Sequence, residues 1–411
     1  MSGPVGRAAE PSDAVAGIVP KVVYTPASVE EAAQVLAQTR TMNAAIAFVG
    51  GGSELELGAP PRALEAVLRT ERLNRIVEYI PDDMVMTVEA GVPLASLQRT
   101  TAEHGQQLAL DPPSPDRSTV GGLVATNAFG PRRARYGSIK DLIIGATLIL
   151  EDGTITRGGG KVVKNVAGFD VPKLICGSLG TLGMVATATF RLHPRPEASE
   201  TVLVPGQSAT TLRALIAAAR DAQLEPSSCV AFWRQDRWDV AFRFEGFASG
   251  LKQQTERLAA IGTEQKSSCD RIDSAAAQEL WSEHDHIRTQ AELRVKFGSL
   301  SSDLTSIEAE WLAPLLRTVG EAQAAWHPTL GIGFVSGRVL DPARTAKALE
   351  SLRSALTSRG GSLVLTAAPA TVRQQIDVWG PPPSAFQLMR RIKDRFDPDA
   401  RLNPGRFVGG L

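Results

Sequence analysis

The sequence LDPPSPDRSTVGGLVATNAFG, residues 110–130, leads through three prolines to a pair of glycines. Proline fixes φ and biases the preceding residue toward extended geometry, which predicts an ordered, non-helical approach to the glycines. Ser118, Thr119 and Asn127 add short polar side chains beside backbone amides that glycine leaves open. Donors fixed at so little steric cost suit a diphosphate or the edge of a flavin ring. For the glycine pair alone, a tight structural turn is an equally good interpretation.

Two more glycine clusters flank this stretch in the chain. The sequence IAFVGGGSELEL, residues 46–57, is typical of a buried strand followed by an anion-binding turn. The sequence CGSLGTLGMV, residues 176–185, spaces its glycines by three. Neither has the spacing of a Rossmann fingerprint or the ending of a P-loop. Three glycine loops of different design are hard to explain as unrelated turns, and they indicate a backbone that must approach something closely.

Composition excludes several classes of function. The 411 residues have room for two domains, and 44 basic residues balance 44 acidic ones, so net charge predicts neither nucleic-acid nor membrane attraction. No apolar run approaches the length of a membrane span. The N-terminus lacks the apolar core of a signal peptide, which predicts a disordered lead-in to a cytoplasmic protein. Three widely spaced cysteines argue against a disulfide framework and against an iron–sulfur cluster held by this chain alone.

Hydrophobic periodicity predicts two domains that mix helices and strands. In the first half, a strand from residue 22 precedes a helix capped by Ser28 and Glu31, and residues 84–90 and 94–103 read as a strand and a helix. After residue 200 we expect helices at 210–222 and 346–356 and strands at 233–244, 293–297 and 362–367. A tail helix over 384–396 is expected to pack on the first domain through these apolar residues: Phe386, Leu388, Met389, Ile392 and Phe396.

The order of these motifs resembles the FAD-binding domain of the vanillyl-alcohol-oxidase, or PCMH-type, superfamily. Within it, GPRRAR at 130–135 together with VKNVAGFDVPKL at 163–174 is most similar to the E subunit of bacterial glycolate oxidase. The tail RFDPDARLNPGRF, residues 395–407, is similar to the tail shared by glycolate and D-lactate dehydrogenases. The specific part of the resemblance covers about residues 20–195 and the tail; the middle of the chain matches loosely.

The resemblance implies an α+β fold with a two-subdomain PCMH-type FAD-binding domain followed by an α+β cap on the substrate side. We expect this division: a disordered lead-in at 1–18, the FAD-binding domain at 19–196, the cap at 197–383, and a helix and tail at 384–411 packing on the FAD-binding domain. The implied cofactor-binding residues are Val49, Gly50, Gly51, Gly52, Ser53, Glu54, Leu55, Pro112, Pro113, Ser118, Thr119, Gly121, Gly122, Ala125, Asn127, Gly130, Gly180, Gly183 and Val185.

The implied function is that of an FAD-binding subunit in a complex that oxidises a small 2-hydroxy acid of the glycolate or D-lactate type. Electrons would pass from the flavin to an iron–sulfur subunit, beside a second flavoprotein subunit. In this superfamily, covalent attachment of the flavin uses a histidine in the first glycine loop, sometimes together with a cysteine near the second. Residues 49–55 contain no histidine and 121–130 no cysteine, so we expect non-covalent FAD. The expected location is cytoplasmic, or peripheral to the inner membrane through partners.

Two alternatives remain open at this point. One is a self-sufficient FAD-dependent oxidoreductase of another small hydroxy acid or alcohol, with Arg132 or Lys164 holding the substrate. The other is a degenerate scaffold that no longer binds FAD, which the three intact glycine loops disfavour. The catalytic residues are not identified by the sequence.

Cationic side chains near the glycine loops are weak candidates for chemistry. Arg132, Arg133 and Arg135 follow the central loop, and a guanidinium fork there matches a carboxylate or a diphosphate. A solvated surface cluster, or a docking patch for a partner subunit, explains the same three arginines. Lys161 and Lys164 could stabilise a reduced flavin, although exposed loop lysines usually have no such role.

Histidine is scarce in this chain. The related catalytic subunits carry clustered histidines that hold a divalent metal, whereas here only five histidines occur. The pair in residues 284–286 is two positions apart, and on a helix such residues face different directions, so no metal site is predicted. His327 has no second histidine near it in the sequence and is kept as a weak candidate for the catalytic base.

Overall fold

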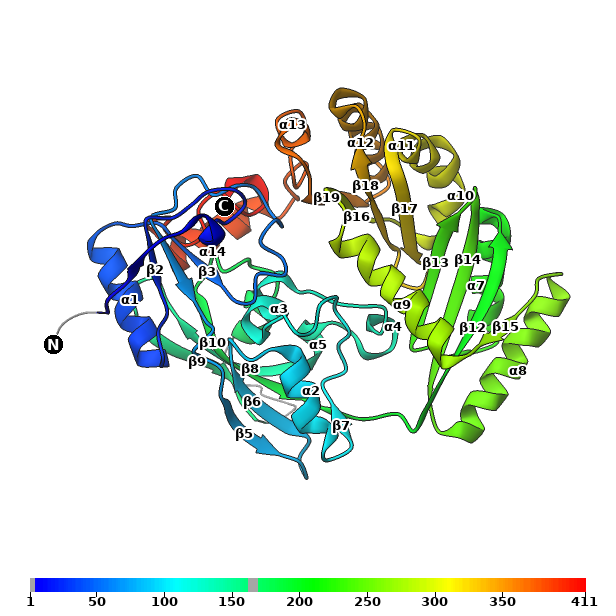
Figure 1. The fold of residues 1–411 in the computed structure, drawn as a ribbon, viewed down its shortest axis with the longest axis horizontal. Helices are drawn as coiled ribbons and strands as arrows, with labels where there is room; N and C mark the ends of the chain where they lie inside the picture. Colours follow the sequence, from blue (N-terminus) through cyan, green and yellow to red (C-terminus); the bar gives the residue numbers. More distant parts are fainter. Residues whose placement is uncertain (1–3, 162–168) are drawn as a thin grey trace. The chain divides into compact units, whose positions relative to one another are not determined.

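The computed structural model describes residues 4–161 and 169–411 (Figure 1). Their contacts divide the chain into two compact units. The first unit contains Met1–Gly130, Gly137–Arg195 and Pro381–Leu411, and the second contains Pro131–Tyr136 and Pro196–Gly380. The short segment Pro131–Tyr136 therefore belongs to the second unit, although the domain prediction from the sequence placed it in the first.

The first unit begins with a small sheet. Among the described residues its strands, in spatial order, are β1 (Arg7–Ala8), β2 (Val22–Tyr24), β4 (Ala66–Arg69) and β3 (Ile46–Val49). Strands β2 and β3 pair with β4 in parallel. Helix α1 (Val29–Thr41) connects β2 to β3 and buries Leu36 against the core. Ser28 caps this helix as predicted, and the Glu31 carboxylate accepts from the amide of Ala27.

A second, antiparallel sheet completes the first unit. Its strands, in spatial order, are β5 (Ile76–Ile80), β6 (Val85–Glu89), β10 (Met184–Arg191), β8 (Ile143–Ile149) and β9 (Ile155–Gly159). Four helices accompany it in the described part of the chain: α2 (Leu94–Ala102), α3 (Val120–Thr126), α5 (Ile139–Leu142) and α6 (Val171–Ile175). Leu97, Leu123 and Phe190 are fully buried or nearly so and join the helices to the sheet in one apolar core.

The expected disordered lead-in at 1–18 is wrong for the residues that the structure describes. Arg7–Ala8 pairs with β2, and a 3₁₀ turn follows at Pro11–Asp13. Asp13 is 2% exposed and accepts hydrogen bonds from the guanidinium groups of Arg7 and Arg69. A buried carboxylate held by two arginines fixes this segment. The sequence did not reveal this contact, because Arg69 is 56 residues away from Asp13.

The paired glycine lies in a helix rather than in a loop. The approach through the prolines is non-helical, as predicted, but α3 begins at Val120 and contains Gly121 and Gly122 in its first turn. A Cβ at Gly121 would lie 2.8 Å from the Cβ of Ala90. Glycine therefore allows α3 to approach the end of β6 closely.

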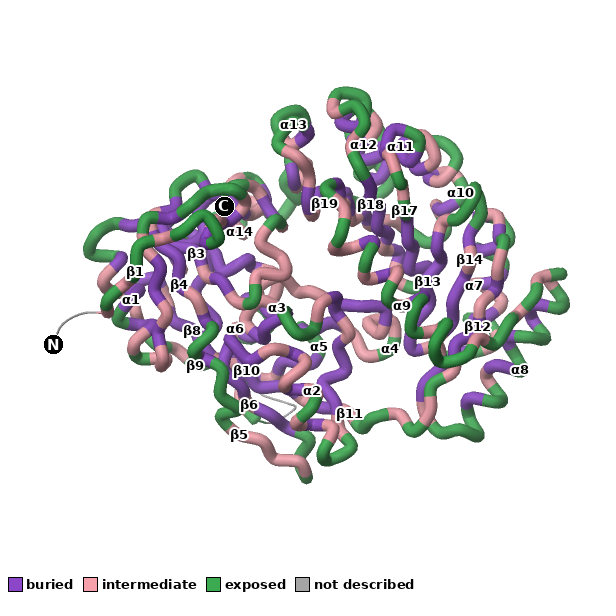
Figure 2. The backbone as a smooth tube through the Cα atoms, in the orientation of Figure 1, coloured by how far each residue is buried: buried purple, intermediate pink, exposed green. Residues whose placement is uncertain are grey.

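The second unit is built on one antiparallel sheet. In the described residues its eight strands, in spatial order, are β15 (Asp270–Ile272), β12 (Ala198–Gln207), β14 (Arg237–Gly246), β13 (Ser228–Arg234), β17 (Val319–His327), β18 (Ile332–Val339), β16 (Leu293–Gly298) and β19 (Ser362–Ala367). Helices α7 (Ala209–Asp221), α8 (Ala248–Glu264) and α12 (Pro342–Thr357) bury apolar residues in its main core. Figure 2 shows buried strands and mostly exposed outer positions on α8.

The single strand predicted at 233–244 is wrong, because these residues form a hairpin. Gln235 and Asp236 both have positive φ, 49° and 62°, and connect β13 to β14. A two-residue hairpin turn with two positive φ angles matches the right-handed twist of the strands. The prediction failed because neither residue is glycine or asparagine, so no turn signal marked the reversal.

The tail helix α14 (Phe386–Phe396) is held by a charged group more than by its apolar residues. Lys393 is its buried residue, and the ammonium donates to the carbonyls of Thr181 and Leu402 and to the carboxylate of Asp397. The predicted burial of Leu388 is wrong, since this side chain is 59% exposed. Leu388 lies five positions from Lys393 and so points to another side of the helix. No helix in the described ranges is long and apolar enough to cross a membrane.

Candidate functional site

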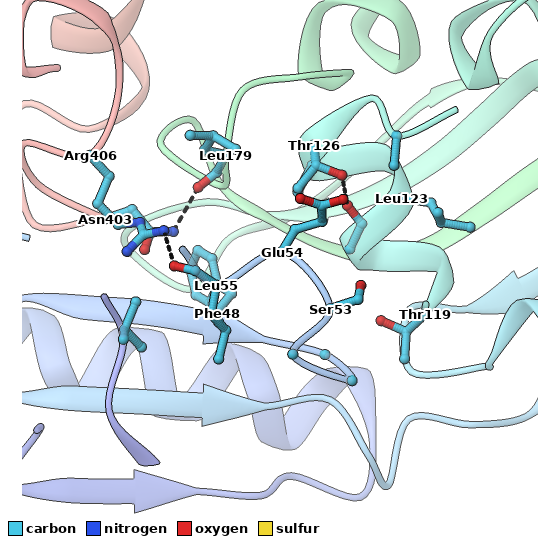
Figure 3. Close-up of a pocket in the computed structure, with 17 residues that line it drawn as sticks. Phe48, Ser53, Glu54, Leu55, Thr119, Leu123, Thr126, Leu179, Asn403 and Arg406 are labelled. Atoms are coloured by element: carbon cyan, nitrogen blue, oxygen red, sulfur yellow. Dashed lines mark hydrogen bonds between the residues drawn. The ribbon is translucent and has the colours of Figure 1, made fainter. Parts of the chain in front are cut away.

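A pocket in the first unit brings the three glycine clusters together (Figure 3). Nine of the predicted cofactor-binding residues line it: Gly50, Gly51, Gly52, Ser53, Glu54, Leu55, Thr119, Gly122 and Ala125. Eight lining residues were not predicted: Val15, Phe48, Leu123, Thr126, Ala128, Leu179, Asn403 and Arg406. The wall of the pocket thus includes residues near both ends of the chain.

The first glycine loop follows β3 and lies directly against the second. A Cβ at Gly51 would be 1.7 Å from the carbonyl oxygen of Arg117, and one at Gly50 would be 2.0 Å from the Oγ1 of Thr119. A side chain at Gly51 would have to move the backbone of Arg117, and one at Gly50 would have to displace the side chain of Thr119. Arg117 also donates from Nη2 to the carbonyl of Gly52, at 3.2 Å. These contacts explain why the sequence has consecutive glycines here.

The second loop presents a buried hydroxyl to the pocket. Thr119 precedes α3 at the N-cap position without capping it, and its side chain is 7% exposed. Its Oγ1 has no hydrogen-bond partner among the described residues. A buried hydroxyl without a partner costs free energy unless a ligand provides one. Thr119 is therefore arranged to bind a polar group in this pocket.

The third loop is shaped by left-handed backbone at its turn. Leu179 has a φ of 51° and Gly180 a φ of 70°. The carbonyl of Leu179 accepts from Nδ2 of Asn403, at 2.8 Å, as Figure 3 shows. A Cβ at Gly180 would lie 2.8 Å from the same Nδ2 and 2.9 Å from Phe48. Gly180 is therefore needed for close packing behind the pocket rather than in its lining.

The other predicted cofactor-binding residues do not line this pocket. They are Val49, Pro112, Pro113, Ser118, Gly121, Asn127, Gly130, Gly180, Gly183 and Val185. Ser118 connects the loops instead, since its hydroxyl donates to the carbonyl of Pro113 and lies 3.3 Å from the hydroxyl of Ser53. Asn127 ends α3 in the left-handed conformation, and its Oδ1 is buried with no partner in the described part of the chain. Their role in cofactor binding stays a prediction.

The arginines after the central loop are bound within the second unit. Arg132 forms a two-pronged ion pair with Glu245, at 2.5 and 3.0 Å, and both side chains are largely buried. Burial alone would raise the pKa of Glu245, but the hydrogen bonds and charge of Arg132 hold it below its usual value. Arg135 donates to the carbonyl of Glu225. Arg132 and Arg135 thus attach Pro131–Tyr136 to the second unit. A docking role toward a partner subunit stays a prediction.

The structure tells little about a catalytic role for the two candidate lysines. Lys161 pairs with Glu78 at 2.5 Å on the surface of the first unit. Lys164 lies outside the described residues. The structure therefore adds no support for a catalytic lysine.

The histidines of the second unit form a buried pair. His284, on α9 (Ser274–Thr289), and His327, at the end of β17, are both 0% exposed, and their Nε2 atoms lie 2.9 Å apart. Burial and the charge of Arg288 lower the pKa of His284 well below its usual value, and burial and His284 do the same for His327. Both rings are therefore neutral, with one nitrogen donating to the other. His286 is exposed and points elsewhere, as its spacing predicted. No group of three or more metal-binding side chains occurs in the described ranges.

Comparison with known proteins identifies an FAD-binding domain in the part of the chain that contains most of the pocket. Residues 20–159 match a family described as "FAD binding domain". The chain is 28% identical to glycolate oxidase subunit GlcE of Escherichia coli K12, over 88% of this chain and 92% of that protein. It is also 28% identical to D-2-hydroxyglutarate dehydrogenase of Xanthomonas citri pv. viticola, over 94% of this chain and 89% of that protein.

Solved structures show the same fold at low sequence identity. An alkyldihydroxyacetonephosphate synthase superposes with a TM-score of 0.73 at 18% identity, covering 95% of this chain and 78% of that one. The p-cresol methylhydroxylase superposes with a TM-score of 0.71 at 14% identity, covering 94% of this chain and 88% of that one. The predicted α+β fold is confirmed.

The chain contains an FAD-binding domain at residues 20–159 and is similar in sequence and fold to FAD-dependent oxidoreductases of the vanillyl-alcohol-oxidase, or PCMH-type, superfamily. Within it the chain is similar to the E subunit of glycolate oxidase over nearly its whole length. The pocket residues fit FAD, because Gly50, Gly51 and Gly52 line the pocket without side chains and the buried Thr119 hydroxyl has no partner among the described residues.

Proposed function

We propose that this chain is the FAD-binding subunit of a 2-hydroxy-acid dehydrogenase complex of the glycolate or D-lactate type. The coarser activity is that of an FAD-dependent oxidoreductase acting on CH–OH groups, as the names of the similar proteins indicate. The observation that carries the proposal is the pocket built from three glycine loops in a chain that aligns with 92% of a glycolate oxidase E subunit.

Different pocket residues would bind different parts of the cofactor. The amides of Gly50 and Gly51 and the hydroxyl of Thr119 would donate to the diphosphate of FAD, at positions where no side chain intervenes. Glu54 brings a carboxylate into the same pocket, which suits a hydroxyl donor of the cofactor better than a phosphate. Bound FAD would supply the hydride acceptor for oxidation at the α-carbon of the substrate. Binding is proposed to be non-covalent, because residues 49–55 contain no histidine.

The contacts within the second unit favour the hypothesis that the chain is a subunit of a complex over the hypothesis that it is a self-sufficient enzyme. It would form the cap on the substrate side, in the division proposed from the sequence. His327, a candidate base, points its Nε2 at His284, so this nitrogen is not open to a substrate. Arg132, a candidate for holding the substrate carboxylate, is bound to Glu245. The proposed partners are therefore a second flavoprotein subunit, which oxidises the acid, and an iron–sulfur subunit. The cytoplasmic location stays a prediction.

A visible spectrum of the purified chain, taken before and after acid precipitation, tests the proposal. We expect a yellow protein that releases its flavin into the supernatant and is not bleached by anaerobic glycolate or D-lactate. Rapid bleaching by either acid would favour the self-sufficient enzyme. A colourless chain that does not take up added FAD would contradict the proposal altogether.

A further inference from the structure

The C-terminal tail lies alongside the strand that carries the first glycine loop. The amide of Ile46, at the start of β3, donates to the carbonyl of Arg401, and the amide of Asn403 donates to the carbonyl of Ile46, both at 2.9 Å. The tail thus extends the small sheet by a short parallel bridge between Ile46 and Leu402. This places the turn that follows, residues 403–406, at the pocket.

Arg406 holds the far end of the first glycine loop. Its Nη2 donates to the carbonyls of Leu55 and Leu57, at 2.8 and 2.6 Å. The backbone of Arg406 adds a third link, because its carbonyl accepts from the amide of Ala59 at 3.1 Å. The two hydrogens of Nη2 have fixed directions in the guanidinium plane, whereas the hydrogens of a lysine ammonium rotate on a flexible stem. Arg406 therefore sets the path of the loop from Gly50 to Leu57.

Asn403 holds the third glycine loop from the same turn. Its Nδ2 donates to the carbonyl of Leu179, while Arg406, three residues later, holds Leu55. Both side chains also line the pocket (Figure 3). One turn of the tail thus fixes two of the three loops that form the wall.

The turn is itself anchored by buried charges. Arg401 is 2% exposed and donates to the carbonyls of Ala44 and Glu151 and to the Glu151 carboxylate. Lys393 and Asp397 form a second buried ion pair, and the Asp397 carboxylate accepts from the amides of Arg401 and Leu402. Breaking such a pair is costly, so the tail is held in one position. A fixed tail can position the loops, whereas a loosely bound one could not.

We propose that Arg406 is a positioning residue for the cofactor. It holds the loop of residues 50–57 in the shape that binds FAD through its two hydrogen bonds to backbone carbonyls. The inference rests on the proposed FAD binding and adds to it the tail as an essential part of the site. The positive charge of Arg406 alone does not suffice, because both bonds leave from Nη2, whose two hydrogens are held in the guanidinium plane.

The test compares FAD affinity in Arg406→Lys and Arg406→Gln with that of the unaltered chain, by titrating FAD into the apoprotein and following flavin fluorescence. Arg391→Gln is the matched control, since Arg391 is an exposed arginine of the same tail. We expect both Arg406 variants to bind FAD about tenfold or more weakly, because one charge-assisted hydrogen bond contributes about that much. The control should bind as the unaltered chain does.

The melting temperature of the apoproteins separates positioning from folding. Arg406→Lys keeps the side-chain stem and the charge, so we expect its apoprotein to melt within a few degrees of Arg391→Gln. Weakened FAD binding in such a folded variant supports positioning. Unchanged affinity in either Arg406 variant would overturn the inference, even though FAD binding by the unaltered chain would still stand. If the unaltered chain binds no FAD, the proposed function fails first.

Discussion

Single residues decide the shape of the pocket wall. The carbonyl of Arg117 stands 1.7 Å from where a Cβ of Gly51 would lie, and the side chain of Thr119 is similarly close to Gly50. The consecutive glycines were visible in the sequence, and their role as a close-approach site was predicted from residue type alone. Asn403 and Arg406 were not predicted to line the pocket, because each binds a carbonyl more than 200 residues away in the chain. No local pattern reports such a contact.

Gly51→Ala should prevent FAD binding. The added methyl group overlaps the backbone of Arg117, which cannot move as a flexible side chain would. We expect FAD affinity to fall at least tenfold, measured by flavin fluorescence on titration. Gly250→Ala is a suitable control, since nothing lies within 4 Å of a Cβ there and its backbone is not in the left-handed region. Wild-type affinity in Gly51→Ala would show that the first loop is not packed as described.

Thr119→Val tests the buried hydroxyl. Valine keeps the shape of threonine and removes an oxygen that has no partner in the described residues. We expect the apoprotein to be as stable as the unaltered chain or more so, because a buried unpartnered group is lost. FAD should bind about fivefold to tenfold more weakly, because one hydrogen bond to the cofactor is lost. Equal affinity would mean that Thr119 does not contact the cofactor.

Helices and strands were predicted correctly where the local sequence pattern and the packing in the folded protein favour the same structure. The α1 helix was predicted with its Ser28 cap, and β19 was predicted at its observed bounds, 362–367. The β13–β14 hairpin was missed because its turn, Gln235 and Asp236, contains neither the glycine nor the asparagine that most often marks a two-residue hairpin turn. The N-terminal strand β1 was missed because its order depends on Arg69, a partner distant in sequence. Long-range ion pairs of this kind leave no periodic signal.

Asp13→Asn should loosen the N-terminal segment. Hydrogen bonds from Arg7 and then Arg69 hold the pKa of Asp13 well below its usual value. A carboxyl whose pKa is lower in the folded state stabilises the fold above its ordinary pKa and loses that effect as the pH falls. We therefore expect Asp13→Asn to lower the melting temperature by about 5–10 °C at pH 7.

The pH dependence gives the Asp13 prediction a second readout. The difference in melting temperature between the unaltered chain and Asp13→Asn should shrink as the pH falls below about 4, where an ordinary aspartate protonates. A difference that stayed constant with pH would show that the charge of Asp13 has no role. Because Val15 lines the pocket, the variant should also bind FAD more weakly.

At the scale of the whole molecule, the fold class and the cofactor were within reach of the sequence. The three glycine clusters, in their order along the chain, carry the family resemblance that implied the α+β fold and FAD, and the comparisons confirm both. The catalytic residues could not be identified from the sequence, because residue type alone selected the candidates and does not show what each side chain contacts. Two of them, Arg132 and His327, are bound to other residues of the second unit. The proposed reliance on a partner for oxidation would account for a chain with an FAD-binding domain and a neutral, buried histidine pair.

The dependence on partners is tested most directly by turnover. The rate of dye reduction by glycolate and by D-lactate would be measured for the FAD-loaded chain alone and for the complex that copurifies with it. We expect negligible turnover by the chain alone, and turnover by a complex that contains a second flavoprotein and an iron–sulfur protein. A chain that oxidises either acid by itself, at a rate comparable to the complex, would contradict the account.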